Sequence, residues 1–133
     1  MRAHTFRKAE HLKSETLIKE LFTKGSSFHL YPFRAIYKII PSAKEPVHQV
    51  LFSVPARSFK KATDRNKLKR RTREAYRLHK AKLSLDTPMI LGFVYSAKKI
   101  ESFDLIKAGV IRIIEKLNAL DTSSQVLISK DFN

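Results

Sequence analysis

Residues 57–82 constrain the fold of this chain more than any other segment, because they are strongly basic and carry a helical pattern at the same time. Twelve of these residues are Lys or Arg and two are acidic, which gives a net charge of +10, compared with +15 for the whole chain. At about 100° per residue, Leu68, Thr72, Ala75 and His79 fall on one narrow arc of a helix. That arc is the predicted contact with the core, and the rest of the helix is predicted to be a basic exterior.

A second arc of this helix is polar, and no acidic residue interrupts it. It holds Arg65, Asn66, Lys69, Arg70, Arg73 and Arg77. Like charges four residues apart repel each other on a helix, which disfavours such a face in the free protein. Guanidinium groups form paired hydrogen bonds with phosphate, Lys adds a point charge, and an amide both donates and accepts. The face therefore predicts binding to a polyanion such as RNA, while Lys67 and Arg71 lie on a third arc that points away.

Two simpler interpretations of this helix are a solvated charged surface and a helix lying on a membrane. A solvated surface intersperses both signs of charge, whereas the polar arc holds no acid. A membrane-surface helix needs Trp, Phe or Leu opposite its charges. Here that side holds only Leu68, Thr72, Ala75 and His79, so we favour nucleic-acid binding.

The first half of the chain predicts one helix and two strands. Ser14 is a candidate N-cap for a helix over residues 15–24, and Gly25 is its predicted stop. Residues 33–40 and 47–54 are rich in branched and aromatic side chains, as strands are. The proline-bounded residues 41–46 predict a hairpin connection between them. A further short strand is expected to complete this pair, at a position that the pattern does not give.

The second half predicts the basic helix, a buried strand and a final helix. Thr63 or Asp64 is the expected cap of the basic helix, which continues to about residue 83. Residues 89–96 are almost continuously apolar, which is typical of a buried strand. Ser102 or Asp104 opens the last helix, which continues to about residue 120.

Length and composition favour one globular domain over residues 1–133, with residues 1–12 and 121–133 frayed. Apolar residues make up 43% of the chain, and cysteine is missing, which fits a reducing compartment. The longest apolar run, residues 89–95, is far shorter than the ~20 residues that cross a bilayer. We expect a cytoplasmic protein.

Protein-borne catalysis has little support in the sequence. The five histidines include no pair four residues apart, the twelve acidic residues are scattered, and three glycines cannot form a glycine-rich phosphate loop. We expect no catalytic residue, no metal site and no cofactor bound by the protein alone.

Three stretches of the chain resemble the bacterial ribonuclease P protein component. Residues 64–77, DRNKLKRRTREAYR, are similar to its signature helix, except that Lys67 stands where the family usually has Arg. The approach to that helix, residues 52–55 followed by Arg57, Lys60 and Lys61, is similar as well. So are residues 12–14 and the end of the first predicted helix, residues 21–25. The resemblance covers about residues 6–120 in element order.

The resemblance implies a fold of class α/β, more closely an α+β two-layer sandwich. The sheet would have four mostly antiparallel strands and about three helices, in the order α-β-β-β-α-β-α. Parallel strands joined through a helix cross over right-handedly in ~98% of cases. The resemblance implies the rare left-handed β-α-β crossover through the basic helix.

The resemblance also implies an enzymatic role as the accessory subunit of a ribonucleoprotein endoribonuclease, which removes the 5′ leader from precursor tRNA. Its partners would be the ribonuclease P RNA, which carries the chemistry with Mg²⁺, and precursor tRNA, with no membrane and no obligate protein partner. Arg57, Lys60, Lys61 and the basic face would bind RNA. The leader would lie in a cleft between the first helix and the sheet.

Aromatic side chains are candidates for that cleft, because bases of any identity stack on aromatic rings. We expect Phe22, Phe33 and Tyr37 to line it. Two alternatives remain open: a free-standing RNA- or DNA-binding module such as a ribosomal protein, and a nuclease that needs no RNA subunit.

Overall fold

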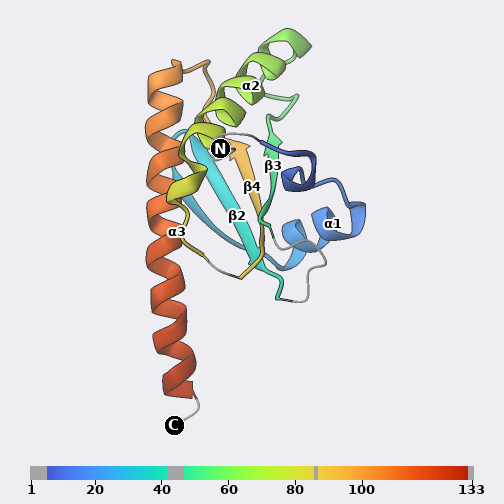
Figure 1. Cartoon of the computed structure of the whole chain (residues 1–133). Helices are drawn as coiled ribbons and strands as arrows, with labels where there is room; N and C mark the ends of the chain where they lie inside the picture. The colour runs from blue at the N-terminus through green and yellow to red at the C-terminus, as the bar shows by residue number, and fades with distance from the viewer. Residues whose placement is uncertain (1–5, 42–46, 86, 132–133) are drawn as a thin grey trace.

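The computed structural model describes residues 6–41, 47–85 and 87–131. Within these residues the chain forms three α-helices, four strands and two short 3-10 helices, whose arrangement Figure 1 shows. In chain order they are η1 (Lys8–Glu10), α1 (Glu15–Lys24), β1 (Ser26–Leu30), β2 (Phe33–Ile39), β3 (Gln49–Ser53), α2 (Ala62–His79), η2 (Lys80–Lys82), β4 (Met89–Tyr95) and α3 (Phe103–Asp131). This order confirms the predicted class.

The four strands form one mixed sheet in the order β1-β2-β4-β3. β2 pairs antiparallel with β1 and β4, whereas β3 pairs parallel with β4. The predicted hairpin between β2 and β3 is therefore wrong, because β4 lies between these two strands. β1 is the short strand that the sequence pattern did not place. The central position of β4 agrees with its continuous apolar sequence, since both of its faces are covered.

Helices cover both faces of the sheet. On one face α2 and α3 pack over a large core that includes Phe33, Phe93 and Ile113. On the other face α1 packs through Leu21 against Ile36 and a smaller apolar cluster. Figure 1 shows α3 running along the sheet and continuing past its lower edge, with α2 crossing above. The left-handed crossover through α2 stays a prediction.

The ends of the helices show which predicted caps form. The Ser14 hydroxyl accepts a hydrogen bond from the Leu17 amide, as predicted, and the Ser102 hydroxyl accepts one from the Leu105 amide. Gly25 follows α1, and a Cβ on it would lie 2.4 Å from the Leu21 carbonyl oxygen. Close backbone approach therefore requires glycine there.

The segment before α1 is folded rather than frayed from residue 6 onward. Glu10 and Leu12 are buried, and residues 8–10 form η1. The Glu10 carboxylate accepts from the Arg7 amide at 2.8 Å and pairs with Lys80 Nζ at 2.5 Å. This ion pair joins the segment to the end of α2. At the other end of the chain, the backbone is helical through Asp131.

Candidate RNA-binding site

α2 begins earlier than predicted and without a side-chain cap. Lys61 is the residue at its N-cap position, and neither Thr63 nor Asp64 caps the helix. Arg65 Nη1 instead donates to the carbonyl oxygens of Phe59 and Lys60, both at 2.8 Å. Arg65 thus fixes the approach to the helix, which uses part of the hydrogen-bonding capacity that we predicted for RNA.

The inner face of α2 follows the predicted core arc with one change. Leu68, Thr72 and Ala75 are buried, as predicted, and the Thr72 hydroxyl donates to the Leu68 carbonyl oxygen. His79 is only half-buried, and Tyr76 is the buried residue instead. The Tyr76 ring packs against Phe93 of the central strand at 5.7 Å between centroids. This packing turns the basic arc outward.

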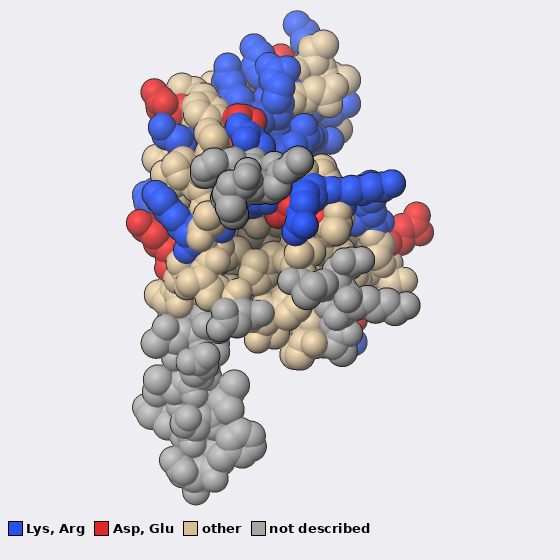
Figure 2. Space-filling view, in the orientation of Figure 1, with Lys and Arg blue, Asp and Glu red and all other residues tan. Residues whose placement is uncertain are grey.

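The outer face of α2 presents the predicted basic residues to solvent. Asn66, Arg70 and Arg73 are exposed and Lys69 is half-exposed. Within the described part of the chain, their side chains form no ion pair or hydrogen bond. Figure 2 shows Lys and Arg side chains gathered over α2 at the top of the molecule. Four neighbouring groups that can bind phosphate or sugar are therefore available on one surface.

The far end of this face differs from the prediction, because an acid does reach it. Arg77 forms an ion pair with Glu74 and also donates from Nε to Glu74 Oε2 at 3.2 Å. The hydrogen bond from Arg77 lowers the pKa of the Glu74 carboxyl. Arg77 is thus partly neutralised, and the strongest phosphate-binding surface runs from residue 66 to residue 73.

The segment around His11 adds to the basic surface, which the sequence analysis missed. The His11 ring packs on Phe6 at 4.2 Å between centroids, and Phe6 contacts Tyr76 of α2 at 5.8 Å. Burial lowers the pKa of His11, and the charges of Lys13 and Arg73 lower it further. Lys13 and Arg73 therefore each lie close enough to the His11 ring to act on it electrostatically.

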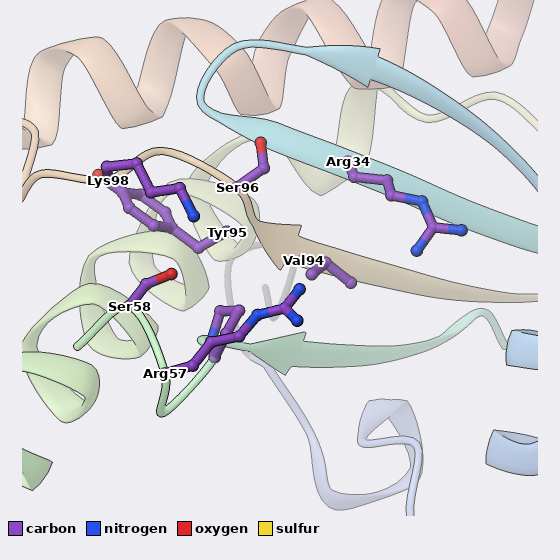
Figure 3. A pocket seen from close by; sticks show the side chains of 8 residues that line it. Arg34, Arg57, Ser58, Val94, Tyr95, Ser96 and Lys98 are labelled. Carbon is purple, nitrogen blue, oxygen red and sulfur yellow. The ribbon is translucent and has the colours of Figure 1, made fainter. Parts of the chain in front are cut away.

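A basic pocket lies beside the loop that leads into α2. Arg57, Lys60 and Lys61 are exposed there, as expected for RNA contacts. Arg57 lines a pocket of about 170 Å³ with Arg34 of β2 and Lys98 of the loop after β4 (Figure 3). Ligand pockets for whole small molecules span ~300–1,000 Å³, so this one suits a single phosphate with part of its sugar.

The floor of this pocket is on the same face of the sheet as α1. Arg34 pairs with Val94 across β2 and β4, two residues from the pair Ile36 and Gly92. Side chains two residues apart point to the same face of a strand. Because Leu21 of α1 lies against Ile36 and Gly92, Arg34 and Val94 occupy the part of that face next to the helix. Arg34 and Lys98 were not predicted; the basic alternation of Arg34 and Lys38 along β2 was the available signal.

The predicted aromatic lining of the leader cleft is wrong in part. Phe33 is 1% exposed and packs against Phe93 and Tyr95 in the large core, on the face covered by α2 and α3. Tyr37 shares this face and contacts Phe28 at 6.0 Å. Neither ring can converge with Phe22 of α1, which lies on the opposite side of the sheet. Phe22 is 45% exposed and is the candidate that remains.

The described residues contain no group of three His, Asp or Glu side chains that could hold a metal ion. They also contain no helix long and apolar enough to cross a membrane.

Comparisons with known proteins agree on one family. The family model described as Ribonuclease P matches residues 6–118. A ribonuclease P protein component of Porphyromonas gingivalis strain ATCC 33277 is 37% identical over 73 residues, which are 55% of this chain and 53% of that protein. The chain thus spans about half the length of that relative. The ribonuclease P protein component of Chlorobium phaeobacteroides is 28% identical, and the match covers 88% of this chain and 90% of that protein.

Solved structures show the same fold. The ribonuclease P protein of Staphylococcus aureus superposes with a TM-score of 0.65 at 22% identity, over 81% of this chain and 94% of that one. The ribonuclease P protein of Thermotoga maritima superposes with a TM-score of 0.62 at 20% identity, over 80% of this chain and 96% of that one. Because the family model matches most of the length of this chain, the chain belongs to the ribonuclease P protein family.

Proposed function

We propose that this protein is the accessory subunit of ribonuclease P, which binds the catalytic RNA and the 5′ leader of precursor tRNA during tRNA maturation in the cytoplasm. The observation that carries the proposal is the outer face of α2, where Asn66, Lys69, Arg70 and Arg73 have no partner within the described residues. The family to which the chain belongs supports it. Removal of the leader is then the activity of the assembled ribonucleoprotein.

The division of labour follows from the chemistry of the side chains. Cations on a rigid helix hold the RNA backbone through phosphate contacts, which are strong but independent of sequence. We assign the hydrolytic chemistry, with Mg²⁺, to the RNA subunit. The protein contributes affinity and orientation.

We keep the leader on the α1 face of the sheet, where the resemblance implies it, and assign it to lining residues other than Phe33 and Tyr37. Arg34, Arg57 and Lys98 supply three cations around one small pocket, which favours a phosphate of a single strand. Phe22 on α1 offers an exposed ring on the same side of the sheet for a base. Such contacts tolerate leaders of variable sequence, because every nucleotide has a phosphate and a flat base.

Reconstitution tests this function directly. The purified protein is added to a bacterial ribonuclease P RNA at low Mg²⁺, and cleavage of precursor tRNA is measured. We expect the protein to restore cleavage at the leader junction and to cut nothing without the RNA. A protein that binds RNA but does not stimulate cleavage would be a free-standing binding module. Cleavage by the protein alone would identify a self-sufficient nuclease.

A further inference from the structure

The loop between β4 and α3, residues 96–102, carries Lys98 into the basic pocket. Lys98 itself is exposed, and its ammonium lies at the end of a flexible side chain, so the loop backbone decides where it can reach. Figure 3 shows Lys98 extending into the pocket from the loop after β4, with Arg34 across from it and Arg57 below. The pocket therefore needs this loop to hold one conformation.

The start of the loop is fixed by the turn between β1 and β2. The Ser96 amide donates to the Pro32 carbonyl oxygen at 2.8 Å, and the Ser96 hydroxyl donates to the same oxygen at 3.2 Å. The Ala97 amide lies 3.3 Å from that oxygen as well. One carbonyl thus holds the residues immediately before Lys98.

The end of the loop is fixed at Glu101. Its amide donates to the Tyr95 hydroxyl at 3.0 Å, and that hydroxyl donates to the Lys99 carbonyl oxygen at 2.7 Å. The Tyr31 hydroxyl donates to the Glu101 carboxylate. Arg71 Nη1 donates to the Glu101 carbonyl oxygen at 2.7 Å.

Arg71 is the contact in this set that comes from the basic helix. It lies on the arc of α2 that points away from the RNA-binding face, and it is half-buried against the loop. A hydrogen bond from a charged donor is about twice as strong as one between neutral groups. The bond therefore ties α2 to the far end of the loop that carries Lys98.

We infer that Arg71 is a positioning residue for leader binding: through its hydrogen bond to Glu101 it holds the loop so that Lys98 completes the phosphate pocket with Arg34 and Arg57. This inference rests on the proposed function. It assigns the two sides of α2 to two ligands. The outer face binds the RNA subunit directly, and the side that carries Arg71 acts on the leader through the loop.

The test compares Arg71→Ala with Lys67→Ala in the reconstituted enzyme. Lys67 is a matched control because it is a half-exposed cation on the same helix and outside the predicted RNA face. Two affinities are measured: that of the protein for ribonuclease P RNA, and that of the enzyme for precursor tRNA relative to mature tRNA. We expect Arg71→Ala to reduce the precursor-to-mature ratio about threefold to tenfold, which lies in the lower part of the roughly 2- to 150-fold range of coupled residues. Lys67→Ala should leave this ratio unchanged, and Arg71→Lys, which keeps a charged donor, should restore part of it.

A double-mutant cycle with Lys98→Ala shows whether Arg71 acts through Lys98. If it does, the precursor-to-mature affinity ratio of the double variant is no lower than that of Lys98→Ala alone, because the effects of dependent residues are not additive. Additive losses, or equal losses in the Lys67→Ala control, would overturn the inference. Arg71→Gln replaces Arg71→Ala if the latter unfolds, and hydrogen exchange of the Lys98–Glu101 amides reports the loop itself. Unchanged exchange in the Arg71 variants would also overturn it.

The same experiment separates this inference from the proposed function. If Lys98→Ala leaves the ratio unchanged while the enzyme still cleaves, the pocket does not bind the leader and the inference falls with it. If Lys98→Ala lowers the ratio and Arg71→Ala does not, the pocket stands and the positioning role is refuted. If the protein fails to stimulate cleavage at all, the proposed function itself is wrong.

Discussion

Replacing Lys69, Arg70 and Arg73 together by Ala removes three cations from the outer face of α2, and its effect on salt dependence follows from their exposure. Each phosphate contact contributes roughly 0.7–0.9 to the slope of log affinity against log salt. Loss of three contacts should therefore flatten the slope by about 2.1–2.7. Between ~50 and ~200 mM salt, the variant should lose about 20- to 40-fold less affinity for ribonuclease P RNA than the parent protein.

The assay is a titration of ribonuclease P RNA at several salt concentrations, with thermal unfolding measured for each protein. Lys82, Lys107 and Lys116, which lie after α2 and on α3, provide a control, since their replacement by Ala removes the same total charge from another surface. We expect the control to retain most of the parent slope. An equal flattening in both triple variants would show that total charge, and not this face, sets the affinity.

Three other predictions concern the aromatic residues, a histidine and a buried ion pair. Phe33→Ala should cost ~3–5 kcal/mol of stability, because it leaves a cavity in the core. Phe22→Ala should leave the melting temperature nearly unchanged and should weaken the binding of precursor tRNA more than that of mature tRNA. Equal melting temperatures of the two variants would contradict this. Burial lowers the pKa of His48 below its usual 6.5, so this histidine binds a proton more readily in the unfolded chain than in the folded one. The stability of the fold should therefore fall as the pH drops below 6.5. His48→Gln should reduce this pH dependence in thermal unfolding. Glu10→Ala removes a buried carboxylate that accepts from the Arg7 amide and pairs with Lys80, and it should cost ~3–5 kcal/mol in denaturant unfolding. A loss below ~1 kcal/mol would mean that these contacts are unimportant.

The sequence alone determined the parts of this protein that depend on local periodicity. The two arcs of α2 were predictable because a residue's angular position on a helix follows from its number, so Leu68 and Ala75 face inward and Arg70 and Arg73 face outward. The apolar run of β4 likewise predicted a strand buried on both faces. The basic surface and the family followed from these same residues.

The tertiary structure alone decided which face of the sheet each side chain meets and which long side chains find partners. Alternation along β2 shows that Phe33 and Tyr37 share a face, but it does not show that α2 and α3 cover that face while α1 covers the other. The insertion of β4 between β2 and β3 depends on pairing between segments distant in sequence, which local pattern does not encode. Arg71 was expected to point away from the RNA-binding face, and the fold brings the Glu101 carbonyl within its reach. The partner of a long charged side chain is set by the backbone that the topology places beside it.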